Sequence, residues 1–142
     1  MHGQREALMK ALKTVLYNQI AVNGEVVQYY VDYFGDKDMG IYLQSYQGDN
    51  ADNKHFEGEL ATITLVVFAK NKTVDFVAEA SRKVRQLLKA SVTGTIALVD
   101  GYNATYTNVV VMSSETLNND GAIEHRDSIR FEIMINVNTN EG

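Results

Sequence analysis

The sequence contains no cysteine and no proline among its 142 residues. Without cysteine the chain has no disulfide, no thiolate metal site and no cysteine nucleophile. A reducing compartment is therefore favoured, because small secreted domains usually depend on disulfides. Without proline no X-Pro isomerisation can limit folding, so the turns have to be built from Gly, Asn and Asp. The sequence also has no apolar run long enough to span a bilayer, which argues against a membrane protein.

Basic residues are in the minority, because 13 Lys and Arg stand against 18 Asp and Glu, a net charge of -5. This balance argues against a dedicated nucleic-acid binder, which needs a basic surface to neutralise phosphates. An acidic surface suits a conduit through which DNA passes without sticking, and it equally suits plain solubility. With 45% hydrophobic and 22% charged residues, the composition is that of a globular protein, and we expect residues 1–142 to form one domain.

Hydrophobic periodicity predicts two amphipathic helices, Arg5–Tyr17 and a second that starts after the candidate N-cap Thr73 and runs to about Ser91. Alternation and β-branched or aromatic content predict strands at 25–34, 39–46, 59–70, 95–99, 106–113 and 129–137. Runs of strands joined by hairpin-type turns favour antiparallel pairing. The predicted fold class is therefore α+β: a mostly antiparallel sheet with both helices packed on one face, in the order α-β-β-β-α-β-β-β.

The last strand carries the clearest pattern, because five apolar residues alternate with Arg, Glu, Met and Asn. A slip of one residue would turn all five to water, so the register is strongly specified. These residues are Ile129, Phe131, Ile133, Ile135 and Val137. The strand Glu59–Lys70 is apolar on both faces, which predicts a central strand or one covered by an oligomeric partner.

Polar segments separate the predicted strands. Gln47–Phe56 is predicted to be a long hairpin loop with a mobile part at Gly48–Lys54, because it is rich in Asp and Asn. Glu115–Ala122 is predicted to be a second polar loop, and Asp100-Gly101 a tight turn. Asn138–Gly142 is expected to be a frayed tail.

The densest charge cluster is Glu124-His125-Arg126-Asp127. Residues two apart on a strand share a face, so His125 could act as a base oriented by Asp127. However, no nucleophile, oxyanion motif or glycine-rich cradle accompanies the pair. A solvated contact surface is therefore the favoured interpretation, with no catalytic residue, no metal and no cofactor.

Three further patterns have a structural and a functional interpretation. Acidic residues at 36, 38, 49 and 52 suggest calcium only weakly, since an EF-hand's closing glutamate is missing and turn chemistry explains Asp36 and Asp38. Tyrosines and Phe34 crowd positions 29–46 and could stack bases or form a subunit interface, but half-buried sheet positions are favoured. The basic residues of the second helix are interpreted as its solvated side; they are Arg82, Lys83, Arg85 and Lys89.

The order of elements and three local patterns resemble the tail-completion or tail-terminator proteins of tailed bacteriophages. The first pattern is the helix around Glu6-Ala7-Leu8, which ends before Ala21-Val22 and leads into a Val- and Tyr-rich strand. The second is the strand Ala61–Ala69 running into the helix that holds Val77-Ala78-Glu79-Ala80 and Leu87-Leu88. The third is Asp120-Gly121, then His125-Arg126, then Arg130-Phe131-Glu132-Ile133.

The resemblance implies a non-enzymatic virion protein, assembled in the cytoplasm of a bacterial host, that forms a ring, commonly a hexamer. Such a ring caps the tail tube and ends its polymerisation. Its implied partners are copies of itself, the tail-tube protein and the neck or head-connector protein, and DNA passes through its lumen without specific binding. Exposed loops and sheet edges would carry the contacts. The expected assembly residues are Asp49, Asn50, Asp52, Lys54, His55, Asp120, Glu124, His125, Arg126 and Asp127.

Two alternatives stay open. The family often has proline between its early strands, where this chain has Gly35-Asp36-Lys37-Asp38, and this departure leaves room for a head-completion or neck connector ring. The alternative from a different class is a small-ligand binding module or enzyme that uses Glu124–Asp127 with the Tyr-rich strands. It predicts a closed concave pocket lined by these residues.

Overall fold

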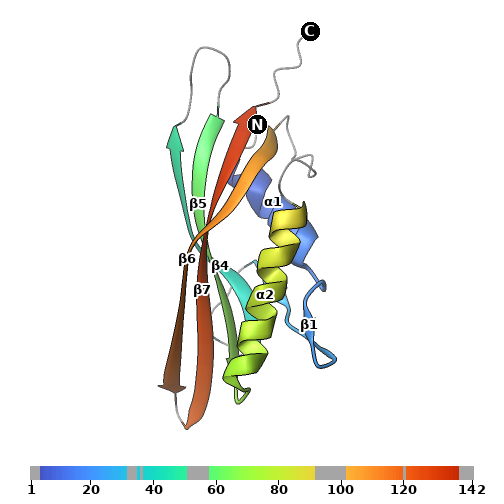
Figure 1. Cartoon of the computed structure of the whole chain (residues 1–142), viewed down its shortest axis with the longest axis vertical. Coiled ribbons are helices and arrows are strands. Elements are labelled where there is room, and N and C mark those ends of the chain that lie inside the picture. Colours follow the sequence, from blue (N-terminus) through green and yellow to red (C-terminus); the bar gives the residue numbers. More distant parts are fainter. Residues whose placement is uncertain are drawn as a thin grey trace.

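In the computed structural model, which describes residues 4–31, 35, 37–50, 58–91, 102–119 and 121–137, a twisted sheet packs against two helices. The helices α1 (Gln4–Leu16) and α2 (Val74–Ser91) lie on the same side of the sheet (Figure 1). The sheet has five strands in the order β3-β4-β5-β7-β6, and all but one of its strand pairs are antiparallel. The predicted α+β class, with helices on one face of a mostly antiparallel sheet, is confirmed.

Two long hairpins make up most of the sheet. One consists of β4 (Met39–Asn50) and β5 (Gly58–Lys70), and the other of β6 (Tyr102–Asn119) and β7 (Ala122–Val137). The hairpins join where β5 pairs with β7, from Gly58 opposite Asn136 to Lys70 opposite Glu124. Three short strands complete the part of the structure that is described. They are β3 (Tyr29–Tyr30), parallel to β4, and the separate hairpin of β1 (Ala21–Val22) and β2 (Glu25–Val26).

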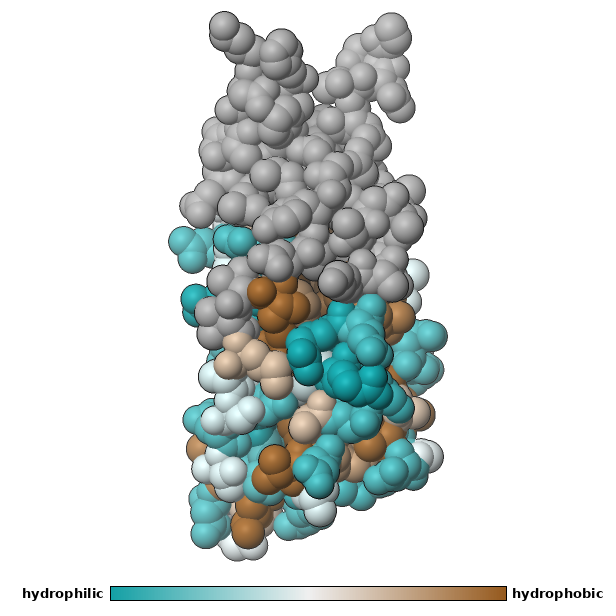
Figure 2. Space-filling model, in the orientation of Figure 1, coloured by the Kyte–Doolittle hydropathy of each residue, from teal (hydrophilic) through white to brown (hydrophobic). Residues whose placement is uncertain are grey.

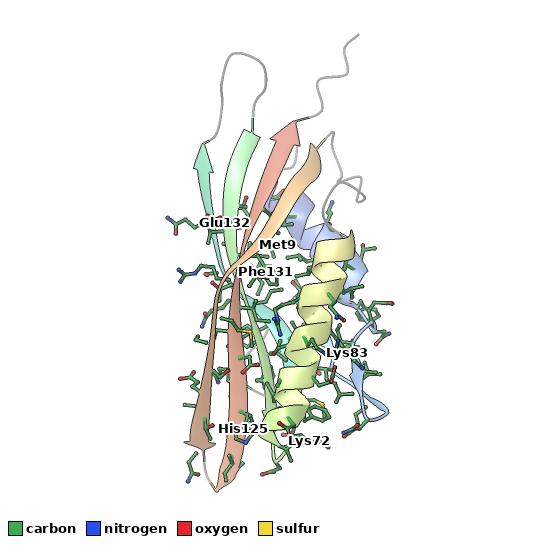
Figure 3. The ribbon with its side chains drawn as sticks, in the orientation of Figure 1. Met9, Lys72, Lys83, His125, Phe131 and Glu132 are labelled. Atoms are coloured by element: carbon green, nitrogen blue, oxygen red, sulfur yellow. The ribbon has the colours of Figure 1, made fainter. Side chains whose placement is uncertain are left out.

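The core lies between the sheet and the helices, and the alternation of β7 decides which of its residues enter it. Ile129, Phe131 and Ile133 are fully buried, whereas Arg130 is exposed. Figure 3 shows Phe131 and Glu132 on opposite sides of the sheet. On β5, Val66 and Phe68 are as buried as their neighbours on the helix side. The predicted buried face of the last strand is confirmed at Ile129, Phe131 and Ile133, and Glu59–Lys70 is an inner strand, as predicted. The side chains of Ile135 and Val137 lie outside the described residues.

The second helix begins as expected. The Phe76 backbone N–H donates to the Thr73 hydroxyl at 3.1 Å, which satisfies one of the donors left open at a helix N-terminus. Asp75 lies in the first turn, where a negative charge interacts favourably with the helix dipole. The predicted apolar stripe packs on the sheet: Phe76, Val77, Ala80, Val84 and Leu88 are buried and Leu87 is partly buried.

Loss of this cap should destabilise the protein measurably. We expect Thr73→Ala to lower the free energy of unfolding by about 1 kcal/mol, because the Phe76 N–H loses its acceptor. Urea denaturation followed by circular dichroism measures the change. Thr73→Ser keeps the hydroxyl and is the matched control, so an equal loss in both variants would contradict a capping role.

The predicted strand at 25–34 is wrong in its extent. It is divided into β2 and β3, and Val31, which follows β3, is 43% exposed. The physical reason is that the chain changes partners along this stretch. The Val27 N–H donates to the Ile20 carbonyl at 2.8 Å, whereas the Gln28 carbonyl accepts from the Ile41 N–H at 2.8 Å.

Both long hairpins extend farther than predicted. Gln47–Asn50 belong to β4 rather than to a loop, and Asn50 pairs with Glu59. Glu115–Asn119 belong to β6, and Gly121, with φ of +81°, takes the left-handed conformation that a tight turn needs. The rest of the first loop, the predicted strand Thr95–Val99, the turn Asp100-Gly101 and the tail Asn138–Gly142 lie outside the described residues.

Gly40 of β4 allows β3 and the preceding residue Gln28 to lie close against β4. A β-carbon at Gly40 would overlap the Tyr30 ring, with Cδ2 at 2.7 Å, and would stand 3.1 Å from the Gln28 carbonyl oxygen. We therefore expect Gly40→Ala to lower the free energy of unfolding by about 1–3 kcal/mol. Urea denaturation measures this. In a chain that already carries Tyr30→Ala, Gly40→Ala should lower the free energy of unfolding by a smaller amount. If the losses from the two substitutions simply add, the overlap is contradicted.

Candidate functional site

The charge cluster Glu124–Asp127 lies near the start of β7, and its residues alternate between the two sides of the sheet. Asp127 and His125 lie on the side of the helices, in register with Val67 and Ala69 of β5. Glu124 and Arg126 lie on the opposite side, with Arg126 in register with Phe68. The cluster therefore divides into two pairs with different surroundings.

Glu124 and Arg126 form a charged pair on the side away from the helices. Glu124 is only 2% exposed, and its Oε2 atom accepts from Arg126 Nη2 at 2.5 Å and from Nε at 3.1 Å. A longer ion pair of 3.9 Å joins Arg126 Nη1 to Oε1 of Glu115 on β6. Partial burial lowers the pKa of the Arg126 guanidinium, but the hydrogen bond and charge of Glu124 outweigh this and raise that pKa above its ordinary value. Arg126 therefore neutralises a buried carboxylate.

Asp127 and His125 have separate partners. The Ser81 hydroxyl of α2 donates to Asp127 Oδ2 at 2.7 Å, and both residues are buried. His125 is half-buried, and its Nδ1 atom is 3.0 Å from the hydroxyl oxygen of Thr116 on β6. The bond between Ser81 and Asp127 ties α2 to the sheet. Since this Asp127 oxygen is taken by Ser81, the disfavoured alternative of His125 as a base oriented by Asp127 receives no support from the geometry.

The expectation that the whole cluster is solvated contact surface is wrong for two of its members, since Glu124 and Asp127 are buried. His125 and Arg126 remain partly accessible. The partners Ser81 and Thr116 were not among the predicted residues. For Ser81 a signal existed: Val77, Ser81, Val84 and Leu88 follow the spacing of one buried helical stripe. A serine on such a stripe needs a buried acceptor.

Two of the other expected assembly residues lie among the described residues. Asp49 and Asn50 lie on β4, where they pair with Leu60 and Glu59, so they belong to a strand end. Asp52, Lys54, His55 and Asp120 lie outside the described residues.

The described tyrosines between positions 29 and 46 occupy sheet positions. Tyr29 is buried, and this burial raises the pKa of its phenol to about 12. Tyr30 and Tyr42 are half-buried; the Tyr42 ring meets Phe68 edge to face at 5.8 Å, and Lys37 Nζ lies 5.5 Å from the Tyr30 ring centre. Tyr33 and Phe34 lie outside the described residues. The arrangement agrees with the favoured interpretation as half-buried sheet positions.

Hydrophilic residues gather over the middle of α2 (Figure 2), but the predicted basic side is partly used by internal contacts. Arg82 pairs with Glu79, and Lys83 Nζ donates to the Ala21 carbonyl at 2.5 Å. Figure 3 shows Lys83 on the side of α2 that faces the β1–β2 hairpin. A cavity of about 500 Å³ opens there, lined by Gln19, Ile20, Ala21, Lys83, Gln86 and Leu87. None of these residues belongs to the charge cluster, so this cavity is not the pocket that the ligand-binding hypothesis predicts.

Within the described residues, no three His, Cys, Asp or Glu side chains come together in a way that could hold a metal ion. The carbonyl of Asp38, one of the acidic residues considered for calcium, accepts from the Lys70 N–H at 2.7 Å. Of the helices in the described part of the chain, none is both long and apolar enough to cross a membrane.

No protein-family model and no curated protein matches the sequence. The fold does match a chain in the solved structure of the virion of the native gene transfer agent (GTA) particle. The TM-score is 0.70 at 17% sequence identity, and the match covers 96% of this chain and 99% of that chain. The two chains therefore share their fold from end to end.

Proposed function

We propose that this protein is a structural component of a phage-like particle. It assembles as a ring on the end of the tail tube, ends tube polymerisation and presents the surface to which the head is joined. The observation that carries the proposal is the shared fold with a virion chain over 96% of this chain and 99% of the other. The match covers nearly the whole of both chains. It therefore supports the view that the two proteins are equivalent building blocks, and not that they share one common domain within different proteins.

The site geometry supports a structural role. The charges of Glu124–Asp127 are satisfied by one another or by Ser81 and Thr116, so this cluster is built as internal support. The side chains that remain exposed on β6 and β7 include Val109, Met112, Glu115 and Arg130. In this proposal the partners are other copies of the chain, the tail-tube protein and the neck or head-connector protein, and DNA crosses the lumen.

Light scattering and electron microscopy test the proposal directly. Purified protein is measured alone and mixed with the tail-tube protein of the same particle, and the lengths of tubes grown with and without it are compared. We expect a discrete oligomer, alone or on the tube, and tubes that stop growing once it is bound. A protein that is monomeric in both conditions, with tube lengths unchanged, would refute the proposal.

The same mixture separates the two ring roles. A tail terminator limits tube length, whereas a head-completion or neck ring binds the connector protein and leaves free tubes unaffected. Adding the connector protein in place of the tube protein therefore distinguishes them. Binding to the connector alone would assign the neck role and contradict the terminator role.

A further inference from the structure

A long strand lies at one edge of the sheet, and another lies next to the opposite edge. β6 lies at one edge and pairs with β7 along one side, and β4 lies next to the other edge. Among the described residues, β3 covers β4 at Ile41 and Tyr42 alone, while β4 continues past Ser45 and Gln47 to Asn50. An edge strand presents a row of backbone donors and acceptors and is a template for pairing with another chain.

β6 lacks the usual protection of an edge strand. Glu115 is its single charged residue, and it contains no lysine and no proline, the residues that commonly block pairing at an edge. Its register with β7 shifts at Val109/Val111 and is then regular to Asn119. Among the described residues, no strand pairs with the outer side of Val109–Asn119, so this side can accept a partner strand.

Two apolar side chains of this stretch are exposed. Val109 is 38% and Met112 is 40% exposed, although both lie on the helix side of the sheet, in register with the fully buried Phe131 and Ile129. The apolar face of the sheet is therefore only partly covered at the β6 edge. A strand added beside β6 would place its own side chains next to these two, since cross-strand neighbours on one face are in contact.

The directions of the strands identify a partner edge. Each of β4, β5, β7 and β6 runs antiparallel to the next, so β4 and β6 point in opposite directions. In a ring all copies have the same orientation along the axis. The β6 of one copy then meets the β4 of the next copy in antiparallel orientation, the more stable of the two pairings. Contacts between two different edges are heterologous, and heterologous contacts form a ring when the rotation between neighbouring copies closes.

We propose that the outer edge of β6 from Val109 to Asn119 pairs antiparallel with the outer edge of β4, around Ser45 and Gln47, of a second copy of this chain. This inference rests on the proposed ring and adds to it the residues that join its subunits. The ring would then contain one continuous sheet, and Val109 and Met112 would be covered by the neighbouring subunit.

Engineered cysteines test this pairing against a background free of native cysteine. Ser113 on β6 and both Ser45 and Gln47 on β4 are exposed on the side of the sheet away from the helices. The double variants Ser113→Cys with Ser45→Cys and Ser113→Cys with Gln47→Cys are treated with a short bis-maleimide, alone and with the tail-tube protein. We expect a covalent ladder that ends at the size of the ring. The single variants should give no ladder, and mixing two complementary single variants should give covalent dimers only.

A matched pair of surface variants adds a second measurement. Met112→Lys puts a charge on the edge, whereas Ile123→Lys alters an exposed apolar residue of β7 near the hairpin turn, on the inner strand. We expect Met112→Lys to abolish the oligomer at a concentration at which Ile123→Lys assembles normally, with equal thermal midpoints for both.

The outcomes separate this inference from the proposed function. A ring seen by light scattering without a ladder from either double variant would overturn the edge pairing and leave the ring intact. Cross-linking of Ser113→Cys alone would indicate two-fold pairing of β6 with itself, and recovery of a different virion protein on the edge would indicate another occupant. Either result overturns the inference. Absence of any oligomer would overturn the proposed function as well.

Discussion

Arg126→Ala is expected to lower the free energy of unfolding by about 3–5 kcal/mol, because it leaves the Glu124 carboxylate buried without its counter-charge. Glu124 is 2% exposed, and Arg126 supplies both of its short hydrogen bonds, at 2.5 and 3.1 Å. The more exposed Glu115 cannot replace the guanidinium, since it carries the same charge as Glu124. Urea denaturation of both proteins measures the loss.

Two controls distinguish a buried charge from a lost contact. The pair between Lys72 and Glu25 has a similar distance of 2.6 Å, but its side chains are 30% and 43% exposed. Lys72→Ala should therefore cost less than about 1 kcal/mol. The double change Glu124→Gln with Arg126→Gln removes both charges and should recover much of the loss. If it is no better than Arg126→Ala alone, desolvation of Glu124 is not the cause.

The sequence predicted the parts of the fold that local pattern determines. The alternation at Ile129–Val137 fixed the buried side of β7, and the two apolar faces of Glu59–Lys70 placed that strand in the centre of the sheet. The helix stripe and the Thr73 cap follow the same logic, because each depends on residues a few positions apart.

Strand ends could not be predicted in this way. Gln47–Asn50 and Glu115–Asn119 have turn-favouring compositions, yet both are paired along their length. Pairing with a distant strand overrides weak local preference, because each residue added to an existing ladder gains hydrogen bonds and cross-strand contacts. The partner strands are identified only once the sheet order is known.

For the charge cluster, too, local sequence could not predict the surroundings of the side chains. Charged residues are rarely buried without a partner, so Glu124–Asp127 indicated an exposed surface. Ser81 lies 46 positions from Asp127, and the bond between them exists only because α2 packs across β7. Local spacing therefore identified the charged residues but not the environment that decides what they do.

Phe131→Ala should produce a loss of similar size, about 3–5 kcal/mol, by opening a cavity in the centre of the core. Phe131 is fully buried on β7, between Ile63 of β5 and Val109 of β6 in register. Since natural domains are stable by about 5–15 kcal/mol, this single change removes a large part of the total. Its neighbour Arg130 is exposed on the other side of the sheet, so Arg130→Ala should change stability by less than about 0.5 kcal/mol. Urea denaturation of both variants is thus a test of the register itself: comparable losses at positions 130 and 131 would mean that β7 does not present one buried and one exposed side.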